Sequence, residues 1–333
     1  MPARRQAIRA AGLLVSVGVL LLVVVASIAI GAKQIPVGDV WHGLFGNTGT
    51  DNDVVIRDLR LPRTLLGLLA GAGLGLAGAV MQALTRNPLA DPGLLGINAG
   101  ASAAVVSAIS FFGVTSLTGY VWFAFGGAAA VMVLVYALGG VRAATPVRLA
   151  LAGTAATAAL YGYINAVQIM DTAALDKMRF WTVGSLASAS MSTVGQVLPF
   201  IAVGIVLALV VARPLNAMGM GDDTAKALGA HVNRTRVVAM VAVTLLCGAA
   251  TAACGPIIFV GLMVPHIVRS FTGPDQRWIL PYATILSPVL LLGSDVVGRV
   301  VTRPAELQVG IVTALIGGPL FIFLVRRRRM AQL

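Results

Sequence analysis

The sequence carries little charge. Only 24 Lys and Arg and 12 Asp and Glu residues occur among its 333 residues, so charged side chains make up 11% of the chain. Soluble domains contain about 25%. The apolar fraction is 58% and the mean hydropathy is +0.92. This composition excludes an ordinary soluble domain and predicts a membrane protein. The net charge of +12 does not indicate nucleic-acid binding, because no soluble basic segment exists to carry it.

Residues that commonly perform catalysis or hold metals are scarce. The three histidines, His42, His231 and His266, are scattered along the chain, so neither a metal site nor a catalytic triad is expected. The two cysteines, Cys247 and Cys254, lie seven residues apart in one apolar run, about 10 Å by helical rise, which is too far for a disulfide. No G-x-x-x-x-G-K-[ST] nucleotide loop is present. We therefore expect no enzyme activity, metal or cofactor in this chain.

A glycine-rich stretch, "GAGLGLAG" at 71–78, fits the G-x-G-x-x-G fingerprint of dinucleotide-binding proteins. That fingerprint is informative only after a buried strand and at the start of a helix. Here it lies inside Thr64–Thr85, 22 residues without a charged side chain, which predicts a membrane-spanning helix. Gly67, Gly71 and Gly75 recur every four residues, so they line one helix face that another helix can approach closely.

Charge-free windows of this kind divide the chain into ten predicted spans, and we expect a single all-α transmembrane domain. The predicted spans are roughly 11–32, 61–85, 93–112, 119–141, 147–170, 195–212, 235–254, 256–271, 278–300 and 307–325. An even number of spans places both termini on the same side of the membrane.

The distribution of charge predicts which side that is. The side that holds the termini receives 16 of the 24 basic residues and 4 of the 12 acidic residues, so it carries the whole net charge of +12. Positive charge marks the cytoplasmic side of bacterial membrane proteins. We therefore expect a multi-pass protein of the bacterial cytoplasmic (inner) membrane with both termini in the cytoplasm.

One cytoplasmic loop, 213–236, is longer than the others. Asp222 and Asp223 are typical of a helix start, Asp222 and Lys226 are spaced for an ion pair, and Gly229 is placed to end the helix. A short polar helix between two spans predicts a docking element for a soluble partner. The alternative interpretation is an amphipathic linker.

Arginines gather at the borders of two predicted spans on the outer side. Arg57, Arg60 and Arg63 precede the second span, and Asp295 and Arg299 are spaced as a boundary ion pair before the tenth. Such arginines are either interfacial anchors or a cationic site for the carboxylates of a partner.

The predicted spans hold few polar side chains, among which Gln82, Asn98 and Asn165 are candidates to face an interior or to form bonds between helices. A proton- or sodium-coupled carrier normally has Asp, Glu or His in mid-span. Their scarcity indicates that the energy for any transport comes from another subunit.

Four ordered motifs resemble the iron–siderophore and cobalamin permeases of binding-protein-dependent ABC importers, the FecCD-type family. They are "RLPRTLLGLLAGAGLGLAGAVMQALTRNPLADPGLLGINAG" at 61–100 with Arg60 before it, "RPLNAMGMGDDTAKALGAHV" at 213–232, "GPIIFVGLMVPHIVRSFTG" at 255–273 and "AELQVGIVTALIGGPLFIFLV" at 305–325. The resemblance extends over about 33–325.

The resemblance implies a permease dimer with a path between its two chains, two ATP-binding subunits that carry ATP and Mg, and an extracytoplasmic binding protein. It assigns coupling to the ATPase to Gly221, Asp222, Asp223, Ala225, Leu228 and Gly229. It assigns docking of the binding protein to Arg60, Arg63 and Arg299. It assigns the pathway or the packing around it to Gly67, Gly71, Gly75, Gly78, Gln82 and Asn98. A gate region near 142–148 includes Thr145 and Pro146.

One departure bears on the cargo. Many members of the family have Glu-Leu-Pro where this chain has Glu306-Leu307-Gln308, and the Gln is closer to the ferric-enterobactin-type permeases. Those commonly pair with a second, different permease chain, which favours a heterodimer over a homodimer. We expect import of a ferric siderophore, which the resemblance implies to be catecholate-like, with haem or cobalamin as the alternative cargo. A secondary transporter and a membrane-embedded enzyme are the less favoured classes.

Overall fold

The computed structural model describes residues 2–46, 49–114, 116–139 and 145–329, and these form helices without any strand. In chain order the helices are α1 (Pro2–Ala29), α2 (Val37–Phe45), α3 (Asp51–Val54), η1 (Val55–Arg60), α4 (Leu61–Thr85), η2 (Pro92–Leu95), α5 (Ile97–Phe112), α6 (Leu117–Gly139), α7 (Pro146–Met170), α8 (Thr172–Trp181), α9 (Met191–Val210), α10 (Ala212–Met218), α11 (Asp222–Ala227), α12 (Val232–Cys254), α13 (Val260–Thr272), α14 (Gln276–Val301) and α15 (Val309–Arg329).

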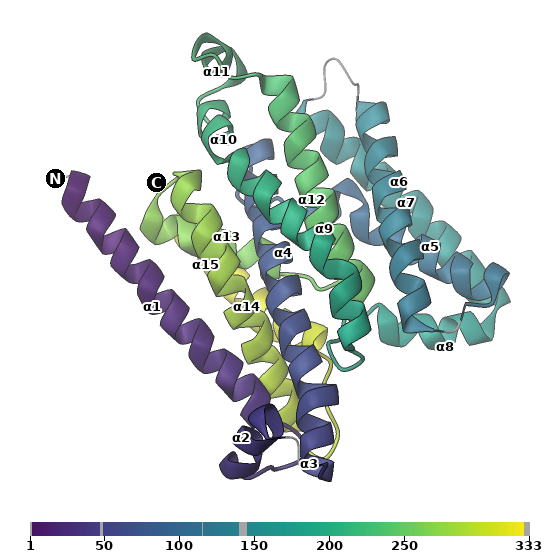
Figure 1. The fold of residues 1–333 in the computed structure, drawn as a ribbon. Helices are drawn as coiled ribbons and strands as arrows, with labels where there is room; N and C mark the ends of the chain where they lie inside the picture. The colour runs from purple at the N-terminus through teal and green to yellow at the C-terminus, as the bar shows by residue number, and fades with distance from the viewer. Residues whose placement is uncertain (1, 47–48, 115, 140–144, 330–333) are drawn as a thin grey trace.

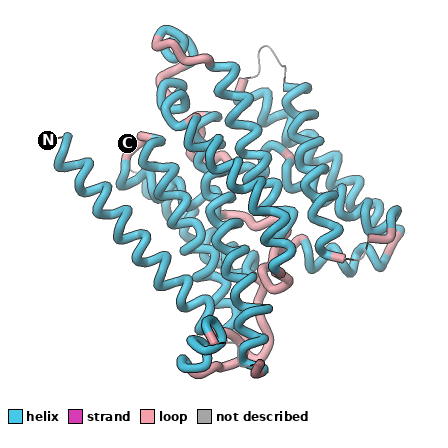
Figure 2. The backbone as a smooth tube through the Cα atoms, viewed as in Figure 1, coloured by secondary structure: helices cyan, strands magenta, loops and turns pink. Residues whose placement is uncertain are grey.

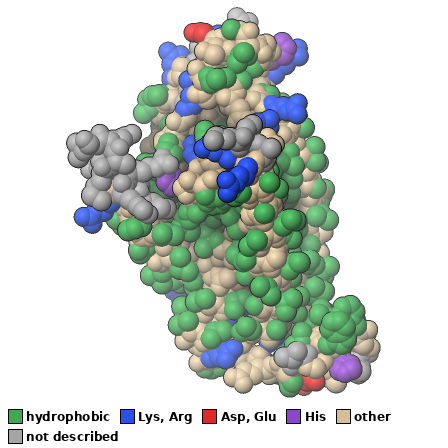
Figure 3. All heavy atoms as spheres, turned by 90° about the vertical axis from the view of Figure 1, so that its left-hand side faces the viewer, with side chains coloured by type: hydrophobic (Ala, Val, Ile, Leu, Met, Phe, Trp, Pro, Cys, Tyr) green, Lys and Arg blue, Asp and Glu red, His purple; other side chains and the backbone are tan. Residues whose placement is uncertain are grey.

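The long helices run roughly side by side and give the bundle two distinct ends. Both chain termini and the short helix α11 lie at one end, whereas α2, α3 and α8 lie at the other (Figure 1 and Figure 2). On the face shown in Figure 3, hydrophobic side chains form a broad band between the ends, and Lys and Arg side chains gather mostly at the α11 end. A belt of this kind matches a bilayer with water on both sides.

Seven helices in the described part of the chain are long and apolar enough to cross a membrane. They are Arg4–Ala29, Asp51–Thr85, Gly119–Gly139, Val147–Met170, Met191–Val210, Val232–Cys254 and Gln276–Val301. The sequence predicted ten spans, and the other three predicted spans contain shorter apolar helices instead. These are α5 with 16 residues, α13 with 13, and the apolar part of α15, Val309–Phe323.

Two of the short helices begin inside the bundle. The side chain of Asn98, in the first turn of α5, accepts a hydrogen bond from Thr251 of α12. Gly261, in the first turn of α13, lies against Gly78 near the middle of the buried helix α4. Helix α5 follows the short 3-10 helix η2, whereas residues 255–259, which lead into α13, are non-helical chain packed among other helices. Such backbone is tolerated at membrane depth only where protein or a water-filled cavity surrounds it.

Helix α4 is the centre of the bundle. In its most apolar window 83% of the residues are buried, against 11% for α1 and 17% for α7. Helix α4 contacts α14, α12, α13 and α9, whereas α1 and α7 leave large apolar side chains exposed. Lipid or another chain can cover those exposed faces, whereas most of α4 is covered by this chain.

The glycines of α4 allow this close packing. A Cβ atom on Gly71 would lie 2.6 Å from Pro288 Cα of α14, and one on Gly75 would lie 2.8 Å from Ala283 O of the same helix. Gly67 faces Leu292 of α14 in the same way. The predicted four-residue glycine repeat thus forms the face that packs on α14, as expected for small residues between membrane helices.

The boundaries follow local chemistry. Helix α9 begins at Met191, four residues before the predicted start at 195, because the Ser190 side chain accepts a hydrogen bond from Thr193 N and caps the helix. Helix α1 reaches back to Pro2 through the Arg-rich segment that was placed before the first span.

Cys247 and Cys254 are both buried and free on α12, so they are not bonded to each other.

We predict that Gly78→Ala destabilises the protein. A Cβ atom on Gly78 would meet the Gly261 carbonyl oxygen of α13, a backbone atom that cannot rotate away. Overpacking of this kind costs about 2 kcal/mol or more. The measurement is the temperature at which the detergent-solubilised protein loses its monodisperse gel-filtration peak.

Gly126→Ala is the matched control, since a Cβ atom on Gly126 of α6 has no heavy atom within 4 Å. Equal melting temperatures for the two variants would contradict the assigned contact between α4 and α13.

Candidate functional site

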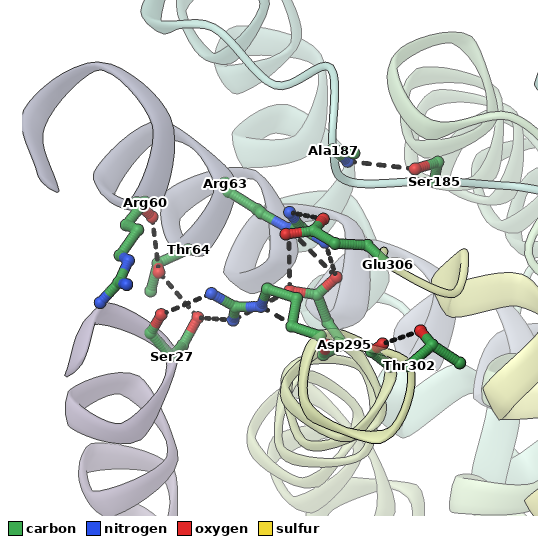
Figure 4. A network of polar contacts seen from close by, with 11 residues as sticks. Ser27, Arg60, Arg63, Thr64, Ser185, Ala187, Asp295, Thr302 and Glu306 are labelled. Atoms are coloured by element: carbon green, nitrogen blue, oxygen red, sulfur yellow. Dashed lines mark hydrogen bonds and ion pairs between the residues drawn. The ribbon is translucent and has the colours of Figure 1, made fainter. Parts of the chain in front are cut away.

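A buried cluster of charged side chains lies at the end of the bundle that carries α2 and α3 (Figure 4). Arg63, in the first turn of α4, donates from Nη2 to Asp295 Oδ1 at 2.8 Å and from Nε to both Asp295 oxygens at 3.1 and 3.0 Å. Arg299, one turn after Asp295 on α14, lies 3.0 Å from the second carboxylate oxygen. Asp295 is completely buried, so one carboxylate serves as the counter-ion of two arginines.

The cluster extends to α1 and to the loop before α15. Arg299 donates from Nη1 to Ser27 O at 2.9 Å and from Nη2 to the Ser27 hydroxyl at 3.1 Å. Arg63 Nη1 lies 2.7 Å from Glu306 Oε2, whose side chain is 32% exposed. Four parts of the chain, α1, α4, α14 and the segment before α15, are therefore joined through charge-assisted hydrogen bonds, which are stronger than neutral ones.

The guanidinium group of Arg60 bonds to backbone oxygens in this region. Its guanidinium donates to Ile28 O at 2.8 Å, to Ala29 O at 2.7 Å and to Lys33 O at 2.5 Å. These carbonyls belong to the end of α1 and the turn after it, where no intrahelical donors follow. Arg60 therefore satisfies the end of α1.

This geometry differs from the expected exposed docking site. Arg60, Arg63 and Arg299 are 4%, 8% and 2% exposed and bonded within the chain, so they do not present free guanidinium groups at the surface. The reason is their position at the apolar border, where an unpaired charge is costly and intrachain partners satisfy it. The predicted pair of Asp295 with Arg299 is confirmed. No local pattern in the sequence indicates that Arg63 shares the same carboxylate, because the two residues are 232 positions apart.

A pocket of about 280 Å³ opens beside the cluster. Four cationic side chains line it, and Glu306 is the one acidic residue in the lining: the cations are Lys33, Arg60, Arg63 and Arg299. The pocket therefore has an excess of positive charge even though Asp295 lies behind it, and that excess favours anionic groups from outside.

The other end of the bundle carries the segment predicted to couple to an ATPase. Asp222, the first residue of α11, accepts from Arg86 Nη2 at 2.6 Å and also from Arg236 Nη2. Arg86 follows the end of α4 and Arg236 lies in the first turns of α12. Asp222 therefore ties α11 to two long helices. Gly221 just before it has φ +108°, a conformation that suits glycine.

The remaining residues of the segment divide into buried and exposed positions. Ala225 is fully buried and anchors α11, whereas Leu228 is 64% exposed and Asp223 is exposed with only a 3.4 Å contact to Lys226. Gly229, with φ +83°, ends the segment as predicted. An exposed acidic and apolar surface on a tethered helix is suited to contact a soluble partner.

A cavity of about 590 Å³ lies next to this segment, between the end of α4, α10 and the loop before α14. Gln82 lines it and donates from Nε2 to Leu262 O at 2.9 Å. Asp275 also lines it, and hydrogen bonds from Arg277 and Asn216 lower the pKa of its carboxyl group to about 2. Asp275 is therefore ionised at any physiological pH and holds the loop in place.

The remaining predicted residues have packing roles in this structure. Asn98 bonds to Thr251 and so joins α5 to α12. Thr145 caps α7 by accepting from Arg148 N at 3.3 Å, and Pro146 is the first residue of that helix. Residues 140–144 of the predicted gate region lie outside the described residues. No group of three or more His, Cys, Asp or Glu side chains that could hold a metal ion occurs among the described residues.

Comparisons with known proteins agree with this architecture. Residues 19–327 match the profile of the FecCD transport family. The chain is 46% identical over 316 residues to the ferric enterobactin transport system permease protein FepD of Escherichia coli K12, which covers 93% of this chain and 94% of that protein. It is 40% identical to the Fe(3+)-citrate import system permease protein YfmD of Bacillus subtilis, over 91% of this chain and 90% of that one.

A further relative and a solved structure extend the comparison. The hemin transport system permease protein HmuU of Yersinia pestis is 36% identical, over 93% of this chain and 95% of that protein. A solved inward-facing conformation of a metal-chelate type ABC transporter superposes with a TM-score of 0.83 at 28% identity, over 94% of this chain and 98% of that one. The family profile spans nearly the whole chain and a relative over 40% identical covers more than nine tenths of it, so this chain belongs to the FecCD transport family.

Proposed function

We propose that this chain is the permease subunit of a binding-protein-dependent ABC importer that moves a ferric siderophore across the bacterial cytoplasmic membrane. The observation that carries the proposal is 46% identity, over nearly the full length of both chains, to a permease named for ferric enterobactin transport. The same observation favours a catecholate-like cargo. Two alternative cargoes have separate support. Haem is supported by the hemin relative at 36% identity, and cobalamin is supported by the sequence motifs.

The proposed topology has ten membrane segments with both termini in the cytoplasm. Both termini and α11 lie at one end of the bundle in Figure 1, which supports an even number of segments. The net charge supports the same orientation, since 16 of the 24 basic residues fall on the side assigned to the termini. The α11 end is then cytoplasmic, and the end that carries the arginine cluster faces outward.

ATP hydrolysis on two partner subunits is the proposed source of energy. Asp295 is a buried acid at the end of the apolar part of α14 that could have suggested a proton-coupled carrier, but two arginines already neutralise it. We assign the contact with the ATPase to the exposed side of α11 and its end, Asp223 and Leu228, with Asp222 and Ala225 as its anchors. A displacement of α11 would act directly on α4 and α12, because Asp222 bonds to Arg86 and Arg236.

We assign docking of the extracytoplasmic binding protein to the positively charged pocket at the outer end. The pocket lining has four cations and one acid, which suits a partner surface rich in carboxylates. Glu306 is partly exposed and shares Arg63 with the buried Asp295. The second permease chain of the dimer is proposed to be a different protein, as the Gln308 motif suggests.

Uptake of labelled iron in a strain that lacks only this gene tests the proposed function. We expect uptake from a ferric catecholate siderophore to fall to background, while uptake of labelled cobalamin and haem is unchanged. Loss of haem or cobalamin uptake instead would overturn the cargo. Unchanged uptake of all three would overturn the importer assignment.

We predict that Asp223→Arg with Leu228→Arg uncouples ATP hydrolysis from import. Both side chains are exposed, so the fold should persist, while the positive charges and lost apolar contact disrupt an ATPase interface. Iron uptake should fall at least about tenfold with unchanged amounts of protein in the membrane. The control is Ser270→Arg, an exposed position at the same end outside α10 and α11. Equal uptake by the double variant and the control would remove the coupling assignment.

We predict that Glu306→Gln strengthens docking of the binding protein at low salt. The change removes the acid from the pocket lining, while Asp295 still holds Arg63, so the positive potential rises without loss of the fold. The dissociation constant of the complex should fall about threefold in 20 mM salt. In 500 mM salt it should equal that of the unaltered protein, because exposed charges are screened.

Asp58→Asn is the matched control for docking, since it removes one exposed acid at the same end that does not line the pocket. A weaker complex with Glu306→Gln, or the same change with both variants, would contradict the assignment of docking to this pocket.

A further inference from the structure

A second pocket at the outer end, of about 330 Å³, lies between α8, the loop 182–190, the end of α12 and the segment before α15. Aromatic rings and one cation dominate the part of its lining that comes from α6 and α8. Those side chains are Tyr120, Lys177, Phe180 and Trp181. Neither the predicted coupling residues nor the predicted docking residues belong to this pocket.

The side chains from α8 share one helix face. Phe180 and Trp181 follow Lys177 by three and four positions, the spacings at which helical side chains are neighbours. Trp181 is 9% exposed and forms a wall, whereas Phe180 is 57% exposed and stands at the opening. Arg179 lies 4.9 Å from the centre of the Phe180 ring and helps to orient it.

Backbone contacts hold the floor of the pocket rigid. Ser185 N donates to Cys254 O at 2.7 Å, and Gly310 N donates to Gly184 O at 3.1 Å, so three separate segments meet there. A Cβ atom on Gly255 would collide with Trp181 O, which shows how closely the chains approach. Irregular backbone that is packed this tightly lines cavities in membrane proteins, and it provides a preformed site rather than a collapsible gap.

The chemistry of the lining selects a class of ligand. Lys177 is exposed and forms no salt bridge within the described part of the chain, so its ammonium group can bind an anion. The rings of Phe180 and Trp181 offer flat apolar surface for another aromatic ring. Gln308 adds an amide that can donate to a phenolate oxygen. A negatively charged aromatic group uses all three features, whereas citrate and hydroxamate chelates lack the ring.

The pocket adjoins the positively charged pocket assigned to docking. Ala187, in the loop 182–190, lines both, and Figure 4 shows Ala187 and Ser185 beside the pair of Arg63 and Glu306. A cargo released at the docking surface would therefore meet this pocket next.

We propose that this pocket is an outer subsite for the catecholate rings of the cargo, with Lys177 contacting the negative charge, Phe180 and Trp181 stacking on a ring, and Gln308 binding an oxygen. The proposal rests on the proposed function, since it needs an aromatic, anionic chelate as cargo. It adds the residues that would recognise such a chelate in the membrane subunit itself.

The test uses the assembled transporter in proteoliposomes with the ferric complex of a synthetic tripodal tricatechol as probe. Lys177→Gln and Phe180→Ala should each raise the apparent KM for this probe about fivefold, a typical effect for one partly exposed contact. Lys177→Arg should restore most of the affinity. The control on the same helix is Leu175→Ala, which removes an exposed side chain that does not line the pocket and should leave the KM unchanged.

A second readout does not depend on transport. In a variant with Trp41, Trp122 and Trp278 replaced by Phe, the remaining Trp181 should be quenched by the probe, and Lys177→Gln should weaken that quenching about fivefold. If the unaltered transporter takes up the probe but the pocket and control variants have equal KM values, the subsite is overturned and the importer function is not. No uptake of the probe by the unaltered transporter would overturn both the catecholate cargo and the subsite.

Discussion

Helix α4 is held at each end by an arginine that shares a carboxylate with a second arginine. Arg63 in its first turn shares Asp295 with Arg299, and Arg86 just past its last turn shares Asp222 with Arg236. The two α4 arginines are 23 residues apart, about 35 Å along a helix, which is close to the thickness of a bilayer core. The two polar anchors therefore lie at opposite borders of the membrane, and the glycine face between them packs on α14.

This arrangement connects the two proposed functional surfaces through one rigid element. The anchor at Asp295 joins α1, α4 and α14 beside the pocket assigned to docking, and the anchor at Asp222 holds α11, the helix assigned to the ATPase. Because Gly71 and Gly75 bring α4 against the α14 backbone, little compressible side chain separates the two helices. Movement of α11 would therefore shift packed helices as units, as in shear motions of other proteins.

Much of the fold could be predicted from the sequence, because the requirements of a bilayer leave few alternatives. Long charge-free windows marked helices α4, α7 and α14, and the four-residue glycine spacing marked a packing face. The short helices α5 and α13 fall in windows that are as free of charge as those of the long helices, and hydropathy alone does not reveal where a helix begins inside such a window.

The candidate site was less predictable than the fold, because its contacts join residues that are far apart in the sequence. The spacing of Asp295 and Arg299 is local and was recognised, but the bond from Arg63 to Asp295 joins residues 232 positions apart. Basic residues next to a span suggested exposed cations, whereas the fold supplies them with buried partners. The aromatic pocket depends on three backbone segments that meet only in the folded chain, so no local motif could have indicated it.

Reconstitution of the purified transporter in proteoliposomes tests whether ATP drives import from the arginine-cluster face to the α11 face. The binding protein loaded with ferric chelate is placed on the face that carries the arginine cluster, and ATP is supplied on the face that carries α11. We expect labelled iron to appear on the α11 side only when both are present, and we expect neither a proton nor a sodium gradient to replace ATP. Accumulation driven by an ion gradient without ATP, or transport with the two faces reversed, would contradict this expectation.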